Sequence, residues 1–170
     1  MVVPGTEAVA KVLPKLAEQL VILRRQRDEI AEQVERVVES HPLSGVLTSM
    51  PGIGVRSAAR ILVEVSGRGF ASAGHLAAYA GLAPVTRRSG SSIRGERQAQ
   101  RGNRRLKRAL FLSAFSSLKD PTSRRYYDRK RAEHKTHQQA LIALARRRCD
   151  VLFAMLRDGT LYDPEHSLAA

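Results

Sequence analysis

Apolar residues recur at alternating intervals of three and four positions along the first part of the chain. The members of this seam, in which Arg27 replaces one apolar residue, are Leu13, Leu16, Leu20, Leu23, Ile30, Val34 and Val37. Such spacing is a heptad repeat and predicts one helix over residues 14–40, with Pro14 in its first turn. Because the apolar stripe is narrow, we expect a coiled coil, within the chain or between chains. Packing against the chain's own domain is the alternative.

Shorter helical patterns follow a break at residues 40–42. A helix over about 55–65 would bury one apolar face, and Ser72 can cap another helix that Gly81 stops. Residues 82–100 contain Pro, Gly and Ser without a sustained period. This segment therefore predicts a loop or a short ribbon.

The last third of the chain is again helical in its pattern. Helices are expected to begin near Asn103, at Asp120 before a proline, and at Thr136, which caps a long final helix ending at Gly159. The predicted fold is mainly α, with a long N-terminal coiled-coil helix followed by a compact helical domain that contains a helix-hairpin-helix and a basic loop. The expected domains are a coiled-coil arm (1–42), the helical domain (43–160) and a tail (161–170).

The net charge of the chain indicates the class of its partner. The 170 residues carry a formal net charge of +13 and a sequence pI near 11.0, which favours a polyanion, nucleic acid first, through counterion release. Acids and bases nearly balance up to Pro42, so the positive excess and the expected binding surface lie beyond it. A nonspecific, ribosomal-type binder would share this charge.

Cysteine content and hydropathy indicate the compartment. The single cysteine, Cys149, provides neither a disulfide framework nor a cysteine-based zinc site. No apolar run approaches membrane-spanning length, and the first residues lack the pattern of a signal peptide. We therefore expect a cytoplasmic protein without a membrane partner.

A first binding motif is MPGIGVRSAARIL, at residues 50–62. It has the pattern of a helix-hairpin-helix, in which Gly52 and Gly54 let the backbone come close to a ligand. The helix that follows offers N–H groups and its positive dipole end to a phosphate. Arg56, just inside this helix, favours the phosphate interpretation. A tight turn with a purely structural role is the alternative.

A second motif is the basic stretch GLAPVTRRSGSSIRGERQAQRGNRRLKR, at residues 81–108. The basic residues around its serines are Arg87, Arg88, Arg94, Arg97, Arg101, Arg104, Arg105, Lys107 and Arg108. Arginine presents a planar fork to phosphate oxygens, so this run favours fixed phosphates, with a solvated basic surface as the alternative. A serine nucleophile needs a base or charge stabilisation, and no histidine lies near in sequence. Residue chemistry alone does not choose among Ser89, Ser91 and Ser92.

The order of these motifs resembles the C-terminal domain of transposases of the IS110 and IS116/IS902 type. The resemblance rests on PGIG, GRGFASAGHLAAYAGLAP, RRSGSSIRGE, QRGNRRLKRALF and YYDRKRAEHKTHQQALIALARRRCDVLFAML, and it covers about residues 20–160. It implies DNA transposition by site-specific recombination, in which the serine of the Ser-Gly pair after GLAP attacks DNA and holds it covalently. By position that serine is Ser89, followed by Gly90.

The motifs and the resemblance together give a set of residues expected to bind nucleic acid. They are Gly52, Gly54, Arg56, Arg87, Arg88, Arg94, Arg101, Asn103, Arg104, Arg105, Lys107 and Arg108. The resemblance also implies a guide RNA, a homo-oligomer formed through the coiled coil, and a divalent metal, Mg, held by acidic residues of an N-terminal RuvC-like domain.

Two departures from the family pattern change these expectations. Residues 98–101 read QAQR where many members have Ile-Ser/Thr-Lys-Arg, which affects fine phosphate contacts. The acids of the N-terminal helix form no RuvC-like cluster, so no metal site or cofactor is expected in this chain. We expect the RuvC-like domain to be missing and recombination by this chain alone to be weak or absent. A noncatalytic nucleic-acid binder, an inactive transposase remnant and a coiled-coil scaffold are the alternatives.

Overall fold

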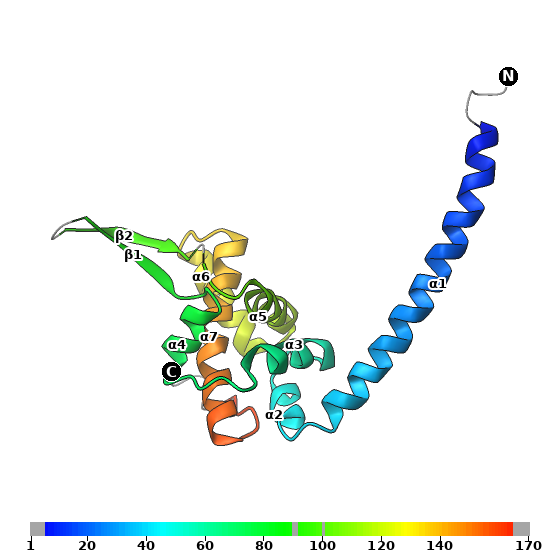
Figure 1. Ribbon diagram of the computed structural model, residues 1–170. Coiled ribbons are helices and arrows are strands. Elements are labelled where there is room, and N and C mark those ends of the chain that lie inside the picture. The colour runs from blue at the N-terminus through cyan, green and yellow to red at the C-terminus, as the bar shows by residue number, and fades with distance from the viewer. Residues whose placement is uncertain (1–5, 90–91, 100, 165–170) are drawn as a thin grey trace. The chain divides into compact units, whose positions relative to one another are not determined.

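The computed structural model describes residues 6–89, 92–99 and 101–164. Its elements are α1 (Thr6–Glu39), α2 (Ser44–Ser49), α3 (Val55–Val65), α4 (Ala73–Tyr79), β1 (Pro84–Ser89), β2 (Ser92–Gln98), α5 (Arg104–Ser116), a 3₁₀ turn (Ser117–Lys119), α6 (Pro121–Ala132) and α7 (His137–Asp158) (Figure 1). The prediction of a mainly α fold with a long N-terminal helix is confirmed. None of the described helices has both the length and the apolar character needed to cross a bilayer.

The chain divides into two units, Met1–Val37 and Val38–Ala170. In the first unit, α1 begins at Thr6, so Pro14 lies inside the helix and its predicted place in the first turn is wrong. The preceding segment, TEAVAKVL, contains no Gly or Pro and includes the helix-favouring residues Glu, Ala, Lys and Leu, so the helix extends past the hydrogen bond that proline cannot make. The four leucines of the predicted seam are between 50% and 61% exposed. Within the described residues of the first unit, nothing covers the apolar stripe of α1.

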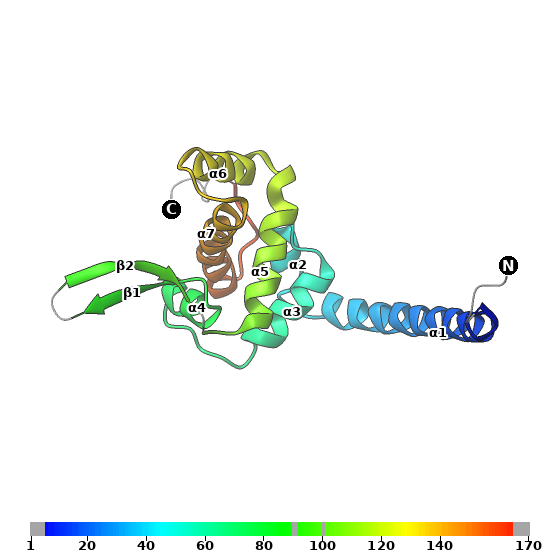
Figure 2. The same ribbon diagram turned by 90° about the horizontal axis from the view of Figure 1, so that it is seen from above.

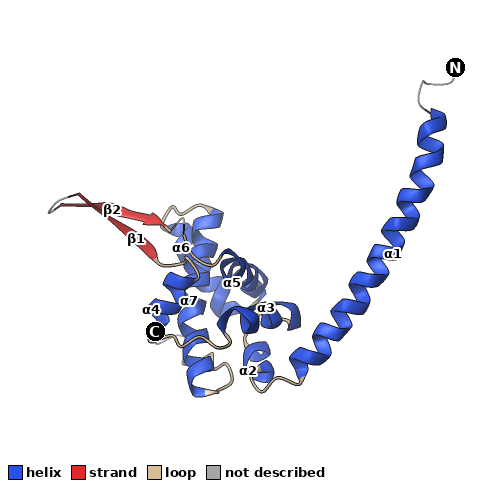
Figure 3. Cartoon of the chain, in the orientation of Figure 1, coloured by secondary structure: helices blue, strands red, loops and turns tan. Residues whose placement is uncertain are grey.

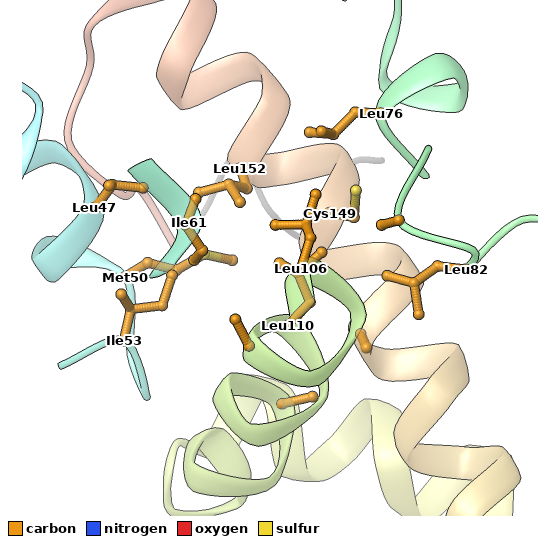
Figure 4. Packing of buried hydrophobic residues seen from close by; sticks show 14 of the residues in the cluster. Leu47, Met50, Ile53, Ile61, Leu76, Leu82, Leu106, Leu110, Cys149 and Leu152 are labelled. Atoms are coloured by element: carbon orange, nitrogen blue, oxygen red, sulfur yellow. The ribbon is translucent and has the colours of Figure 1, made fainter. Parts of the chain in front are cut away.

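The core of the second unit forms around α7. Leu144, Cys149 and Leu152 of this helix are buried, and α4, α5 and α6 all pack against it. Figure 4 shows Leu106 and Leu110 of α5 in the same cluster as Ile61 of α3 and Cys149 of α7. The apolar face predicted for residues 55–65 is confirmed, because Ala58, Ile61 and Leu62 are buried in α3.

Local signals at the helix ends act as predicted. The side chains of Ser72, Asn103, Asp120 and Thr136 each accept a hydrogen bond from a backbone N–H in the first turn of the helix that follows. Thr136 also forms a complete capping box with Gln139, and Gly159 ends α7 in the left-handed conformation, with φ of 66°. These side chains satisfy N–H groups that have no partner within the helix.

In the segment 82–100, for which a loop or a short ribbon was expected, β1 and β2 pair as a two-stranded antiparallel ribbon, red in Figure 3. Pro84 pairs with Gln98 at one end and Ser89 with Ser92 at the other, with an irregularity between Thr86 and Arg88. The basic loop of the predicted fold is thus largely paired backbone. An irregularity of this kind bends the strand and changes the direction of the side chains that follow it.

Two glycines hold the base of the ribbon together. Gly81 has φ of 68° and Gly102 has φ of 118°, and a Cβ on Gly102 would lie 2.6 Å from the Gly81 nitrogen. The Asn103 N–H donates to the Tyr79 carbonyl at 2.7 Å in the same region. Because no larger residue fits this approach, the end of α4 and the start of α5 are fixed side by side.

Candidate nucleic-acid interface

A basic groove of about 460 Å³ lies between α3 and α5, which pack side by side (Figure 2). Its lining residues are Arg56, Ser57, Arg60, Arg105, Arg108, Ala109 and Leu112. The four arginines come from two segments far apart in the sequence, and the fold brings them to one surface. We call this surface the α3–α5 groove.

The charge of the α3–α5 groove is not neutralised within the fold. Among the side chains that the structure describes, no carboxylate lies within ion-pair distance of Arg56, Arg60, Arg105 or Arg108. All four side chains are exposed. Four guanidinium groups in one groove repel one another, and a bound polyanion would remove that repulsion while gaining bidentate hydrogen bonds.

Asn103 fixes the two walls of the groove relative to each other. Its amide oxygen caps α5 by accepting from the N–H groups of Arg105 and Leu106, both at 3.0 Å. Its amide nitrogen donates to Glu64 of α3 at 2.6 Å and to the Tyr79 hydroxyl at 2.8 Å. Both polar atoms of the amide are thus engaged within the fold. In this structure Asn103 holds α5 against α3, and the nucleic-acid contact predicted for it stays a prediction.

The PGIG turn packs against the backbone of α5 at Gly52. This residue has φ of 81°, and a Cβ on it would lie 2.5 Å from the Ser113 carbonyl oxygen. Gly52 therefore packs closely against the backbone of α5, and the nucleic-acid contact predicted for it stays a prediction. Gly54 differs, because it is exposed, a Cβ added to it would meet nothing within 4 Å, and it precedes α3 without a side-chain cap.

A buried arginine anchors the same turn from the other side. Arg148 of α7 is 4% exposed and donates from Nη2 to the Pro51 carbonyl and, at 2.7 Å, to Ser113 Oγ. Burial lowers the pKa of this guanidinium to about 10, although Tyr162 and Asp120 act in the opposite direction. Arg148 thus joins the turn, α5 and α7 at one point.

The other predicted residues lie outside the α3–α5 groove lining. Arg101, which precedes α5, and Arg104, its first residue, are exposed, and Lys107 donates to the Ala99 carbonyl at 3.4 Å, beside the end of β2. Arg87 and Arg88 lie in β1 and Arg94 in β2, where the structure describes the backbone only.

Ser89 is the last residue of β1 and pairs with Ser92 across the ribbon. Its backbone position at the end of the strand is described, whereas Gly90 and Ser91 lie outside the described residues. No group of three or more His, Cys, Asp or Glu side chains that could hold a metal ion occurs in the described part of the chain.

Arg60 and Arg148 were not among the residues predicted from the sequence. Arg60 is four residues after Arg56, so helical periodicity places both on the exposed face of α3. Arg148 occupies the apolar stripe that includes Leu144 and Leu152, at spacings of four residues. The periodicity of α7 therefore marked one of its three consecutive arginines as buried.

Comparison with known proteins gives one family. Residues 44–128 match the family model described as Transposase IS116/IS110/IS902 family. The chain is 58% identical over 165 residues to the insertion element IS110 uncharacterized 43.6 kDa protein of Streptomyces coelicolor, covering 96% of this chain and 41% of that protein.

Two further relatives extend this similarity. The insertion element IS900 uncharacterized 42 kDa protein of Mycobacterium paratuberculosis is 44% identical over 172 residues, which is 99% of this chain and 43% of that protein. The pilin gene-inverting protein of Moraxella bovis is 32% identical over 139 residues, which is 79% of this chain and 43% of that protein. The chain spans about two fifths of the length of these curated relatives.

Proposed function

Because the chain belongs to the IS116/IS110/IS902 family of transposases, we propose that it binds DNA through the α3–α5 groove and takes part in DNA strand exchange during transposition. The observation that carries the proposal is the gathering of four arginines without an acidic partner among the described side chains. A relative whose name describes it as a pilin gene-inverting protein supports recombination as the type of reaction.

The groove and the PGIG turn would act together on a DNA backbone. Gly54 is exposed at the N-terminus of α3, where the first N–H groups have no side-chain cap, and Arg56 follows in the first turn. Backbone N–H groups and the positive end of the helix dipole favour a phosphate at this place. One phosphate at the turn and others along α5 would give backbone contacts that do not read sequence.

Ser89 is the proposed nucleophile. Its Oγ would form a bond to the phosphorus of a DNA phosphodiester while one bond from phosphorus to a sugar oxygen breaks. The serine proton leaves to a base or to solvent, and the released sugar oxygen takes up a proton. In the reverse reaction a sugar hydroxyl attacks the phosphoserine and restores the serine, so exchange needs no external energy source. Guanidinium groups would stabilise the charge that develops on the phosphate oxygens.

The remaining partners are proposed on the family relationship. The exposed apolar stripe of α1 fits a coiled coil with a second copy of the chain, which would cover it. We place the protein in the cytoplasm with its DNA, and assign a guide RNA as a further partner. A divalent metal such as Mg would be held by acidic residues of a RuvC-like domain and would polarise the reacting phosphate there; it is not assigned to the described residues.

A binding experiment tests the DNA-binding part of the proposal. Arg105→Gln combined with Arg108→Gln should weaken binding of a short DNA duplex by about tenfold or more, because charge-assisted hydrogen bonds to phosphate are lost. The control is Arg124→Gln combined with Arg157→Gln, which removes the same charge from exposed arginines paired with Asp128 and Asp158. Equal losses in the two double variants would show that only net charge matters, and the groove assignment would fail.

A further inference from the structure

A second cluster of arginines surrounds the ring of Tyr126 on α6. The guanidinium carbons of Arg129 and Arg147 each lie 5.0 Å from the ring centroid, and the Lys130 ammonium lies 5.5 Å from it. Arg147 comes from α7, which packs against α6. Cation–π attraction therefore gathers three cationic side chains around one aromatic ring.

Tyr126, Arg129 and Arg147 also line a small pocket. Its residues are Thr122, Arg125, Tyr126, Arg129 and Arg147, and its volume is about 170 Å³. A cavity of this size lies below the range of about 300–1,000 Å³ that is typical of sites for small organic ligands. It suits a single tetrahedral anion such as a phosphate group, with the Thr122 hydroxyl as an additional donor. We call it the α6–α7 pocket.

Acidic side chains on α6 and α7, and at the C-cap of α6, form ion pairs with other basic residues. Asp128 pairs with Arg124 at 2.9 Å, and Glu133 pairs with Lys130 and Lys135 at 2.8 and 2.7 Å. Asp150 pairs with Arg146. Among the described side chains, no carboxylate is within ion-pair distance of Arg125 or Arg129. The charges of Arg125 and Arg129 are therefore left for a ligand.

We propose that the α6–α7 pocket binds a phosphate of a nucleic-acid backbone, as a second site separate from the α3–α5 groove. The two sites share no residue and lie on different pairs of helices. A domain with both sites would hold a long nucleic acid at two points, or two segments at once. The proposal extends the proposed function to a second surface and does not require that the groove bind DNA.

The experiment uses the full chain and three fluorescein-labelled probes: a short DNA duplex, a single-stranded DNA and an RNA of the same sequence. Binding is measured by fluorescence anisotropy over a series of salt concentrations. Arg125→Gln combined with Arg129→Gln should lower the affinity and reduce the salt slope by about one, as expected for one lost phosphate contact. The Arg124→Gln and Arg157→Gln double variant is the charge-matched control and should leave most of the slope intact.

The ring is tested separately from the charges. Tyr126→Phe keeps the aromatic platform and should bind as the parent does, whereas Tyr126→Leu removes it and should weaken binding. Thermal unfolding of each variant separates a loss of fold from a loss of site. The probe whose affinity falls most in the Arg125→Gln and Arg129→Gln double variant shows whether DNA or RNA supplies the phosphate.

Repeating the Arg125 and Arg129 change in the Arg105→Gln and Arg108→Gln background separates this proposal from the groove proposal. A further loss in that background supports a second site. If the pocket variant and its charge-matched control bind alike in both backgrounds, the α6–α7 pocket is not a phosphate site. Binding of inorganic phosphate without any effect on the oligonucleotides would likewise overturn the assignment to a nucleic-acid backbone.

Discussion

The amide nitrogen of Asn103 lies 2.6 Å from a carboxylate oxygen of Glu64, so that one hydrogen bond joins the start of α5 to the last turns of α3. Because α3 and α5 form the two walls of the arginine groove, this bond sets the spacing of its guanidinium groups. A neutral amide is suited to the position, since it accepts from the α5 backbone and donates to the carboxylate at the same time.

Replacement of Asn103 by Ala should lower the free energy of unfolding by about 2 kcal/mol, because the helix cap and the bond to Glu64 are both lost. Ser72→Ala removes only a cap, that of α4, and should cost about 1 kcal/mol. Denaturant unfolding measures both. Asn103→Asp keeps the cap acceptor but places a second carboxylate beside Glu64, so it should not restore the parent stability. Full stability in Asn103→Asp would contradict a donor role for the amide.

The two glycines of the PGIG turn should respond differently to Ala. Gly52→Ala forces a Cβ into a left-handed conformation and to 2.5 Å from Ser113 O, and should cost at least about 2 kcal/mol. At Gly54 a Cβ meets nothing within 4 Å, so stability should change little. If Gly54 faces a DNA phosphate, its replacement should weaken DNA binding while thermal unfolding stays unchanged. An unchanged affinity for DNA would remove Gly54 from the interface.

Ser89 should be required for covalent attachment to DNA. In a complete recombination complex, Ser89→Ala should abolish the covalent species, detected as a labelled DNA strand that stays with the protein under denaturing conditions. DNA binding should persist, because the groove is untouched. Ser91→Ala is the matched control and should leave the covalent species in place. The opposite result, with Ser91 required and Ser89 dispensable, would show that the nucleophile is misassigned.

Cys149 should be unreactive in the folded protein. It is 0% exposed, and burial raises the pKa of its thiol to about 12 from an ordinary 9.0. Because the folded pKa is the higher one, the stability that this group contributes is complete below about pH 9.0 and is lost as pH rises toward about 12. Iodoacetamide should therefore modify the native protein far more slowly than the denatured protein at mildly alkaline pH. Equal rates would show that this part of the core is open.

Much of the fold could be predicted from the sequence because its signals are local. Ser72, Asp120 and Thr136 each bond to an N–H three residues away, so the residue type and the following pattern suffice to place the cap. The start of α1 could not be fixed in this way. Proline is common near helix starts, so the pattern placed Pro14 there. Proline is also tolerated inside a helix when its neighbours favour helix, and Pro14 lies inside α1.

The site depends on contacts between distant segments, which the sequence could indicate only by residue type. Arg56 and Arg105 were each expected to bind phosphate, but their meeting in one groove follows from the packing of α3 on α5. The close approach of Gly81 to Gly102 depends on the chain returning through the ribbon. Arg148 could be recognised as buried, whereas its bond to Pro51 required the folded chain.

The salt dependence of DNA binding tests the central claim most directly. The parent protein is compared with a variant in which Arg56, Arg60, Arg105 and Arg108 are all replaced by Gln. The logarithm of the affinity is plotted against the logarithm of the salt concentration. If the α3–α5 groove holds the DNA backbone, the slope falls by about one for each phosphate contact removed, and the affinity falls for every DNA sequence tested. An unchanged slope and affinity in the quadruple variant would contradict the account.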